Sequence, residues 1–195
     1  MSDFGLTLFD TAIGRCGLVW GPRGIVAVHL PEANESLIRS HLLRKCPDAV
    51  EQPRTREVVH AVTSIIGLLR GEKRDLKDIT VDETAWPDFN ARVYVLTRGI
   101  LPGQTLTYGE VASRIGDPGA ARAVGQALGQ NPVPIIVPCH RVLAANGGAG
   151  GFSGAGGVTT KFRMLQIEGA KIGADRSDDA PMLFEPELSV APRRR

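Results

Sequence analysis

The sequence has few cysteines, no long apolar run and almost no excess charge of either sign. Its 3 cysteines show no paired spacing, which argues against a disulfide framework and favours a reducing compartment. No apolar stretch is long enough to span a bilayer. Residues 1–5 lack the basic start and apolar core of a secretory signal. We therefore expect a cytoplasmic protein that does not enter a membrane.

The net charge of +2 gives no strong electrostatic field over the whole protein. Nucleic-acid-binding domains are often far more basic, so any such contact would depend on where individual arginines are placed. The hydrophobic content of 43% and the charged fraction of 23% are ordinary for a globular chain. A length of 195 residues allows one domain or two small ones.

Residues 1–85 predict a small α+β domain. Short apolar runs at residues 6–9, 16–20 and 25–30, separated by glycine-containing turns, are typical of strands. Two helices follow, the first capped by Asn34 and the second ended by Gly71. Their expected buried residues are Leu37, Ile38 and Leu42, then Val58, Val59, Val62, Ile65, Ile66 and Leu69.

Four residues of this segment, Cys16, His41, Cys46 and His60, could in principle bind a metal. None of them forms the closely spaced Cys/His pair that zinc sites usually show. We therefore expect core or surface roles for all four, and no metal.

The segment that begins at Trp86-Pro87-Asp88 predicts a second, mainly helical domain, residues 86–172. Thr107 and Glu110 have the spacing of a capping box, which starts a helix with Val111, Ala112 and Ile115 inward. A turn at residues 116–119 and a helix at residues 120–130 complete a helix-turn-helix pattern. A final helix is expected at residues 161–168, and a mobile tail at residues 173–195.

The second helix of this pattern has two different faces. Ala121, Val124, Ala127 and Leu128 are expected to pack inward, and Arg122, Gly125, Gln126 and Gly129 fall on the other side. Each glycine costs a helix about 1 kcal/mol relative to alanine. The glycines are explained if a polymer must approach the backbone closely, although internal packing could also favour small residues. The pattern alone would place this helix in the major groove of DNA.

The run Pro138-Cys139-His140-Arg141-Val142 is the strongest candidate for a chemical site. Three prolines between residues 131 and 138 make the preceding backbone rigid, which suits a nucleophile held at a defined angle. The alternative is a buried cysteine that packs as a small hydrophobe, with His140 bonded to a carbonyl. Adjacent side chains diverge, so His140 would need a bridging water or a turn to reach the thiol. A free thiol has a pKa near ~8.5 and needs activation.

This signature resembles that of the O6-alkylguanine-DNA alkyltransferases, also called methylated-DNA–protein-cysteine methyltransferases. The similarity covers residues 88–170. It rests on the runs Gly103-Gln104-Thr105-Leu106-Thr107-Tyr108, Ala120-Ala121-Arg122-Ala123-Val124-Gly125, Asn131 through Val142, Gly151-Phe152-Ser153-Gly154, and Lys161 through Gly169.

The resemblance implies a DNA-repair enzyme that acts once, without a cofactor, and moves the alkyl group of O6-alkylguanine to Cys139. Activity on O4-alkylthymine is a further possibility. His140 would take the thiol proton through a water, Glu168 would orient His140, and Asn131 would brace the turn. Tyr108 would donate a proton to the leaving base.

The resemblance also implies how DNA is bound. A monomer would contact the minor groove of duplex DNA through Tyr108, Ala121, Arg122, Gly125 and Gln126. Arg122 would take the place of the flipped-out nucleotide. Val142 and Ser153 would read the base through backbone groups, and Lys161 would support the pocket.

Two departures and three alternatives remain at this stage. Tyr94 stands where many relatives have Trp, and the run after Ser153 is longer than the commonest family spacing. A binding-only relative of this family would lack the cysteine. A cysteine hydrolase would leave the helix-turn-helix unexplained, and a transcription factor would need an operator and usually a dimer surface.

Overall fold

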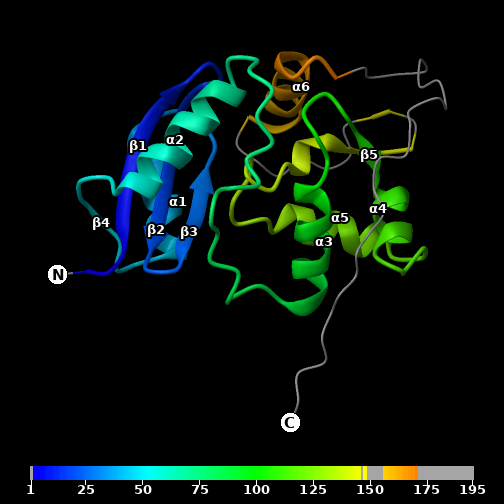
Figure 1. Ribbon diagram of the computed structural model, residues 1–195, viewed down its shortest axis with the longest axis horizontal. Helices are drawn as coiled ribbons and strands as arrows, with labels where there is room; N and C mark the ends of the chain where they lie inside the picture. The colour runs from blue at the N-terminus through cyan, green and yellow to red at the C-terminus, as the bar shows by residue number, and fades with distance from the viewer. Residues whose placement is uncertain (1, 146, 149–155, 171–195) are drawn as a thin grey trace, which may run out of the picture.

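The computed structural model describes residues 2–145, 147–148 and 156–170 (Figure 1). A four-stranded sheet with two helices forms the first part of the chain, and a group of helices forms the second. The predicted α+β class is therefore confirmed. No helix within the described ranges has the length and apolarity needed to cross a membrane.

The sheet has the order β3-β2-β1-β4. The three predicted strands are present as β1 (Gly5–Thr11), β2 (Gly14–Gly21) and β3 (Gly24–His29), and the structure shows that they pair as an antiparallel meander. Gly24 has φ +123°, and a Cβ there would lie 2.6 Å from the Thr80 carbonyl oxygen, so the second turn requires glycine. The two-residue strand β4 (Val50–Glu51), parallel to β1, is too short to carry a detectable alternation and was not predicted.

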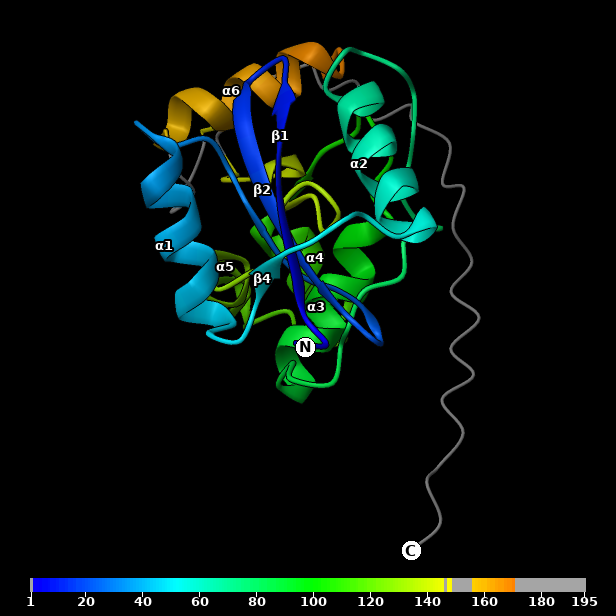
Figure 2. The same cartoon turned by 90° about the vertical axis from the view of Figure 1, so that its left-hand side faces the viewer.

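Helices α1 (Glu35–Lys45) and α2 (Arg56–Leu68) cover opposite faces of the sheet (Figure 2). The predicted cap of α1 is confirmed, because Asn34 Oδ1 accepts a hydrogen bond from the Leu37 amide at 3.0 Å. Two predicted core positions are wrong. Leu37 and Val59 are 41% and 49% exposed, since each lies one position away from the buried stripe of its helix.

The second part of the chain contains the predicted helix-turn-helix. Its elements are α3 (Asp88–Arg98), β5 (Leu106–Thr107), α4 (Tyr108–Arg114), α5 (Ala121–Gly129), a 3-10 turn η1 (Cys139–Arg141), β6 (Val142–Leu143) and α6 (Gly157–Ile167). The capping box is confirmed. Thr107 Oγ1 accepts from the Glu110 amide at 3.1 Å, and the Glu110 carboxylate accepts from the Thr107 amide. The parallel pairing of β5 with β6, which joins distant segments, was not predicted.

Tyr94 fixes the position of α5. Its ring is buried, it packs edge-on against Trp86 at 4.9 Å, and its hydroxyl donates to the Ala127 carbonyl at 2.7 Å. Tyr94 on α3 therefore holds the second helix of the helix-turn-helix from behind.

The sheet and the helical part share one hydrophobic cluster. It includes Phe9 and Val28 from the sheet as well as Val111 and Val137 from the second part. The Val28 amide also donates to the Pro132 carbonyl at 2.9 Å. The domain boundary at 85/86 stays a prediction. The expected tail at 173–195 lies outside the described residues.

Candidate active site

The segment before Cys139 is a tight turn held by one side chain. Asn131 Nδ2 donates to the Val137 carbonyl at 2.8 Å, and Asn131 Oδ1 accepts from the Val133 amide at 3.0 Å. Between them Ile135 has φ +76°, which is rare for a β-branched residue and costs about 1–3 kcal/mol. Ile135 is also 1% exposed, so packing and the Asn131 bonds hold the strained turn in place.

Cys139 follows this turn at the start of η1. The residue is 8% exposed, and its amide donates to the Val137 carbonyl at 2.8 Å. Burial raises the pKa of the Cys139 thiol, although a hydrogen bond with the Asn131 side chain and the charge of Lys161 act in the opposite direction. The thiol is therefore protonated at neutral pH and needs a base before it can attack.

His140 and Glu168 form a buried pair beside this thiol. His140 Nε2 lies 2.9 Å from Glu168 Oε1, and both side chains are 0% exposed. Burial lowers the pKa of His140, against the effect of the Glu168 carboxylate. A neutral ring that donates from Nε2 to the carboxylate keeps the Nδ1 lone pair available. Among the described residues, Nδ1 of His140 has no hydrogen-bond partner, so it is the nitrogen able to accept a proton.

Arg141 completes the group, and no role in the site was predicted for it. Its Nε and Nη2 donate to the two Glu168 oxygens at 2.8 Å each, and its Nη1 donates to the Ile100 carbonyl at 2.5 Å. Burial raises the pKa of Glu168, but the hydrogen bonds from His140 and Arg141 outweigh it and lower this pKa to about 2. Glu168 is thus a fixed carboxylate, and Arg141 compensates its buried charge. A charged residue directly after Cys-His is a signal that could have pointed to this role.

Lys161, Tyr108 and Val142 lie around the same site. Lys161 Nζ donates to the Val142 carbonyl at 2.6 Å and lies 5.8 Å from the centre of the Tyr108 ring. Burial lowers the pKa of Lys161 to about 8, against the effect of the Cys139 thiolate. Burial also raises the pKa of Tyr108, so its hydroxyl keeps its proton and can donate. The Val142 amide donates to the Cys139 carbonyl.

The burial of the α5 side chains agrees with the predicted division of that helix into an inward and an outward face. Val124, Ala127 and Leu128 are buried, whereas Arg122 and Gln126 are exposed. Ala121, expected inward, is only half-buried, as it begins the helix. A Cβ on Gly125 would meet the Tyr108 ring at an ordinary 3.7 Å. Internal packing therefore does not require glycine at this position, which removes one of the two explanations for it.

Ser153, the remaining candidate, lies outside the described residues. The four candidate metal ligands Cys16, His41, Cys46 and His60 are not brought together. Cys16 is buried in the sheet, and burial raises the pKa of its thiol to about 12. His60 pairs with Asp78 at 2.6 Å on the surface.

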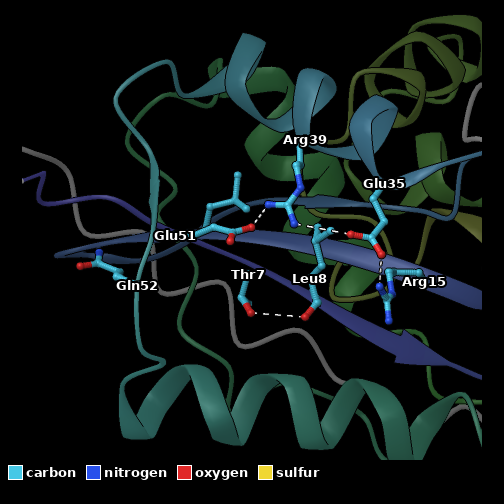
Figure 3. A pocket seen from close by; sticks show the side chains of 8 residues that line it. Thr7, Leu8, Arg15, Glu35, Arg39, Glu51 and Gln52 are labelled. Carbon is cyan, nitrogen blue, oxygen red and sulfur yellow. Dashed lines mark hydrogen bonds and ion pairs between the residues drawn. The ribbon is translucent and has the colours of Figure 1, made fainter.

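A separate open pocket of about 480 Å³ lies on the sheet side of the molecule (Figure 3). Its charged side chains pair with one another. Arg15 contacts Glu35, and Arg39 contacts both Glu35 and Glu51. In these exposed pairs each carboxylate lies against a guanidinium group, so the charges compensate one another.

The second part of the chain matches a family model described as 6-O-methylguanine DNA methyltransferase, DNA binding domain, over residues 88–170. A methylated-DNA–protein-cysteine methyltransferase from Mycobacterium tuberculosis is 49% identical over 88 residues, 45% of this chain and 52% of the relative. The match thus spans about half the length of that relative. Another, from Methanothermobacter thermautotrophicus, is 34% identical over 156 residues, 80% of each chain.

Solved structures extend the likeness to the first part of the chain. The crystal structure of Mycobacterium tuberculosis OGT in complex with DNA has a TM-score of 0.69 and 33% sequence identity. The superposition covers 88% of this chain and 96% of the other.

Proposed function

This chain belongs to the family of methylated-DNA–protein-cysteine methyltransferases, and from that membership we propose that it repairs DNA by moving the alkyl group of O6-alkylguanine to its own Cys139. The observation that carries the proposal is the arrangement of Cys139 beside the His140–Glu168–Arg141 group and next to a helix-turn-helix. Such a thiol can be activated at neutral pH, and such helices can present it to DNA.

The transfer is a single displacement. His140 Nδ1 takes the Cys139 proton through a water, and Glu168 stabilises the resulting imidazolium. The thiolate sulfur then forms a bond to the alkyl carbon as the bond from that carbon to guanine O6 breaks. The electron pair stays on the leaving guanine, which is neutralised by a proton from Tyr108. The products are an S-alkylcysteine and an intact guanine, and no cofactor takes part.

The lesion must first leave the duplex, because a thiol in a buried site cannot reach the alkyl carbon of a base that is still paired and stacked. We assign this step to α5. This helix would enter the minor groove and place Ala121, Gly125 and Gln126 against the DNA backbone. Arg122 would fill the gap left by the nucleotide. Since the Val142 carbonyl already accepts from Lys161, a base that is read through this carbonyl would use its second lone pair. Ser153 would contribute a further contact, and the protein would act as a cytoplasmic monomer.

The number of turnovers tests this function. Mixing the full chain with an excess of duplex DNA that contains O6-methylguanine should repair one guanine per protein molecule and then stop. Intact-mass and peptide analysis should place one added methyl group on the peptide that contains Cys139. Because the site is buried, the extra methyl should destabilise the protein by ~1–3 kcal/mol and lower its melting temperature. Repeated turnover, or a methyl group on another residue, would contradict the proposal and favour a hydrolase.

Base extrusion is tested by Arg122→Ala. We expect this variant to repair duplex DNA about 10–100-fold more slowly, since filling the gap offsets part of the few kcal/mol that unstacking costs. Dealkylation of free O6-benzylguanine, which needs no extrusion, should stay close to the wild-type rate. Arg70→Ala, which removes the same charge from an exposed position after α2, is the matched control. Equal slowing on both substrates would show that Arg122 supports the fold or the pocket instead.

A further inference from the structure

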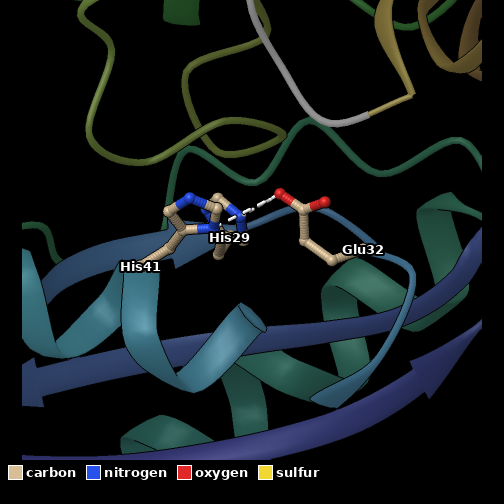
Figure 4. Close-up of side chains that lie close together, drawn as sticks. All are labelled: His29, Glu32 and His41. Atoms are coloured by element: carbon tan, nitrogen blue, oxygen red, sulfur yellow. Dashed lines mark hydrogen bonds and ion pairs between the residues drawn. The ribbon is translucent and has the colours of Figure 1, made fainter. Parts of the chain in front are cut away.

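Three side chains with metal-binding atoms converge on the edge of the sheet far along the chain from Cys139 (Figure 4). His29 ends β3, Glu32 lies in the loop that follows, and His41 comes from the middle of α1. Their donor atoms all lie within 4.8 Å of one another, and no other such group of three occurs in the part of the chain that the structure describes.

Two of the three spacings between these atoms are close to those of ligands around one ion. Glu32 Oε1 lies 3.1 Å from His29 Nε2 and 3.3 Å from His41 Nδ1. Zinc bonds of about 2.0–2.2 Å at tetrahedral angles place neighbouring ligand atoms about 3.3–3.5 Å apart. The two imidazole rings lie 4.5 Å apart at 36°, so they already lie side by side and require little rearrangement.

The protein leaves one of these atoms without a hydrogen bond. His41 Nδ1 is buried and makes none to any described residue, although it lies near the carboxylate. A buried polar atom without a partner costs about 1–3 kcal/mol, and such atoms in native proteins call for an explanation. A metal ion bound by the Nδ1 lone pair would remove this cost.

We propose that His29 Nε2, His41 Nδ1 and the Glu32 carboxylate bind one zinc ion, with a water in the fourth position. Imidazole with a carboxylate suits zinc. The side chains of His29, Glu32 and His41 are 18%, 22% and 30% exposed, which leaves a path for the ion. The site shares only His41 with the four candidates of the sequence analysis, and for that residue the proposal replaces the expectation of no metal.

The ion would act on the structure rather than on the reaction. It would join β3 to α1 at His29, the residue next to Val28, whose amide donates to the Pro132 carbonyl. Lys45 of α1 lies 3.5 Å from the same carbonyl. Pro132 belongs to the turn that Asn131 braces. Zinc would therefore fix the positions of β3 and α1, which both contact this active-site turn.

The experiment measures zinc binding to the metal-free full chain by competition with a chromophoric chelator, together with the melting temperature. Cys139→Ser is used as the background, because Cys139 and His140 could also bind zinc. We expect one zinc ion per chain and a higher melting temperature. His29→Ala and His41→Ala should each lower the affinity at least about 100-fold, since groups that only hydrogen-bond to a ligand are worth 10–100-fold. His60→Ala, at an exposed histidine, is the matched control and should bind zinc normally.

Cobalt(II) substitution provides a second readout that does not depend on the alanine variants. The proposed site predicts tetrahedral cobalt bands without a thiolate charge-transfer band. If the alanine variants fold poorly by circular dichroism, Glu32→Gln, which keeps the side-chain shape, should still weaken binding. Absence of zinc binding, unchanged affinity in the histidine variants, or a thiolate band would each overturn the proposal.

Discussion

Replacing Cys139 by serine is expected to abolish alkyl transfer while leaving binding to lesion-containing DNA largely intact. A serine hydroxyl is hardly ionised near neutral pH, and His140 cannot make it a comparable nucleophile. The transfer rate should fall on the order of 10⁴–10⁶-fold, the range seen when an enzyme loses its nucleophile. Single-turnover transfer from labelled DNA and a gel-shift titration measure the two properties separately.

The other cysteines are the controls for this change. Cys16 and Cys46 are buried, and burial raises the pKa of both thiols, so neither is poised to react. Cys16→Ser and Cys46→Ser should transfer one methyl group normally once correct folding is confirmed by circular dichroism. Transfer that persists in Cys139→Ser would remove Cys139 from the mechanism.

The second large effect is expected at Glu168, which affects both stability and rate. Glu168→Ala leaves the buried Arg141 cation without its carboxylate, and breaking a buried pair in this way costs about 3–5 kcal/mol. Glu168→Gln keeps the shape and should be milder. Denaturant unfolding measures both variants against Glu51→Gln, a change at a surface glutamate that is remote from Cys139 in the fold. If Glu168→Ala lowers the free energy of unfolding no more than Glu51→Gln does, the Arg141–Glu168 pair contributes nothing to stability.

The same pair predicts how stability depends on pH. The pKa of Glu168 is lowered from 4.5 to about 2 on folding, so its stabilisation is complete above pH 4.5 and is lost as pH falls toward 2. The difference corresponds to about 3 kcal/mol. The free energy of unfolding of the wild-type protein should fall by this amount as pH falls from 4.5 toward 2. Glu168→Gln cannot titrate there, so its curve should be flatter by the same amount.

The Glu168→Gln change should also alter how the rate of transfer depends on pH. An amide stabilises imidazolium less than a carboxylate does, so His140 becomes a weaker base and transfer near neutral pH should slow by about 10–100-fold. The rate should partly recover at higher pH, where the thiolate forms without a base. A pH–rate profile identical to that of the wild type would exclude Glu168 from proton transfer.

Local patterns allowed much of the fold to be predicted, because their physical causes lie within a few residues. The Thr107–Glu110 capping box and the Asn34 cap each satisfy backbone amides one turn away, and both were found. The β5–β6 pair, by contrast, depends on contacts between segments far apart in the sequence. Nothing in the residues themselves states which distant partner they meet.

The same distinction applies to the two sites. Proximity in sequence pointed to Cys139 and His140, and family resemblance pointed to Glu168. Arg141 was missed because its role depends on a carboxylate 27 positions away. The His29–Glu32–His41 group was missed because its third member comes from a different element. The strained φ of Ile135 has no sequence signal, since β-branched residues are usually found in extended backbone.

The hydrophobic cluster shared by the sheet and the helices limits how this chain can diverge or be shortened. Val133, Ile136 and Val137 pack in the same cluster as Val28 and Leu30 of the sheet side. A fragment of residues 88–170 alone would expose this apolar surface, and we expect it to aggregate unless another cover replaces the sheet. The first 85 residues therefore need to conserve an apolar face of the right volume rather than particular side chains. Such a requirement allows many substitutions in the first part of the chain while the fold is kept. This explains how a relative can superpose on 88% of this chain although its sequence aligns with only 45% of it.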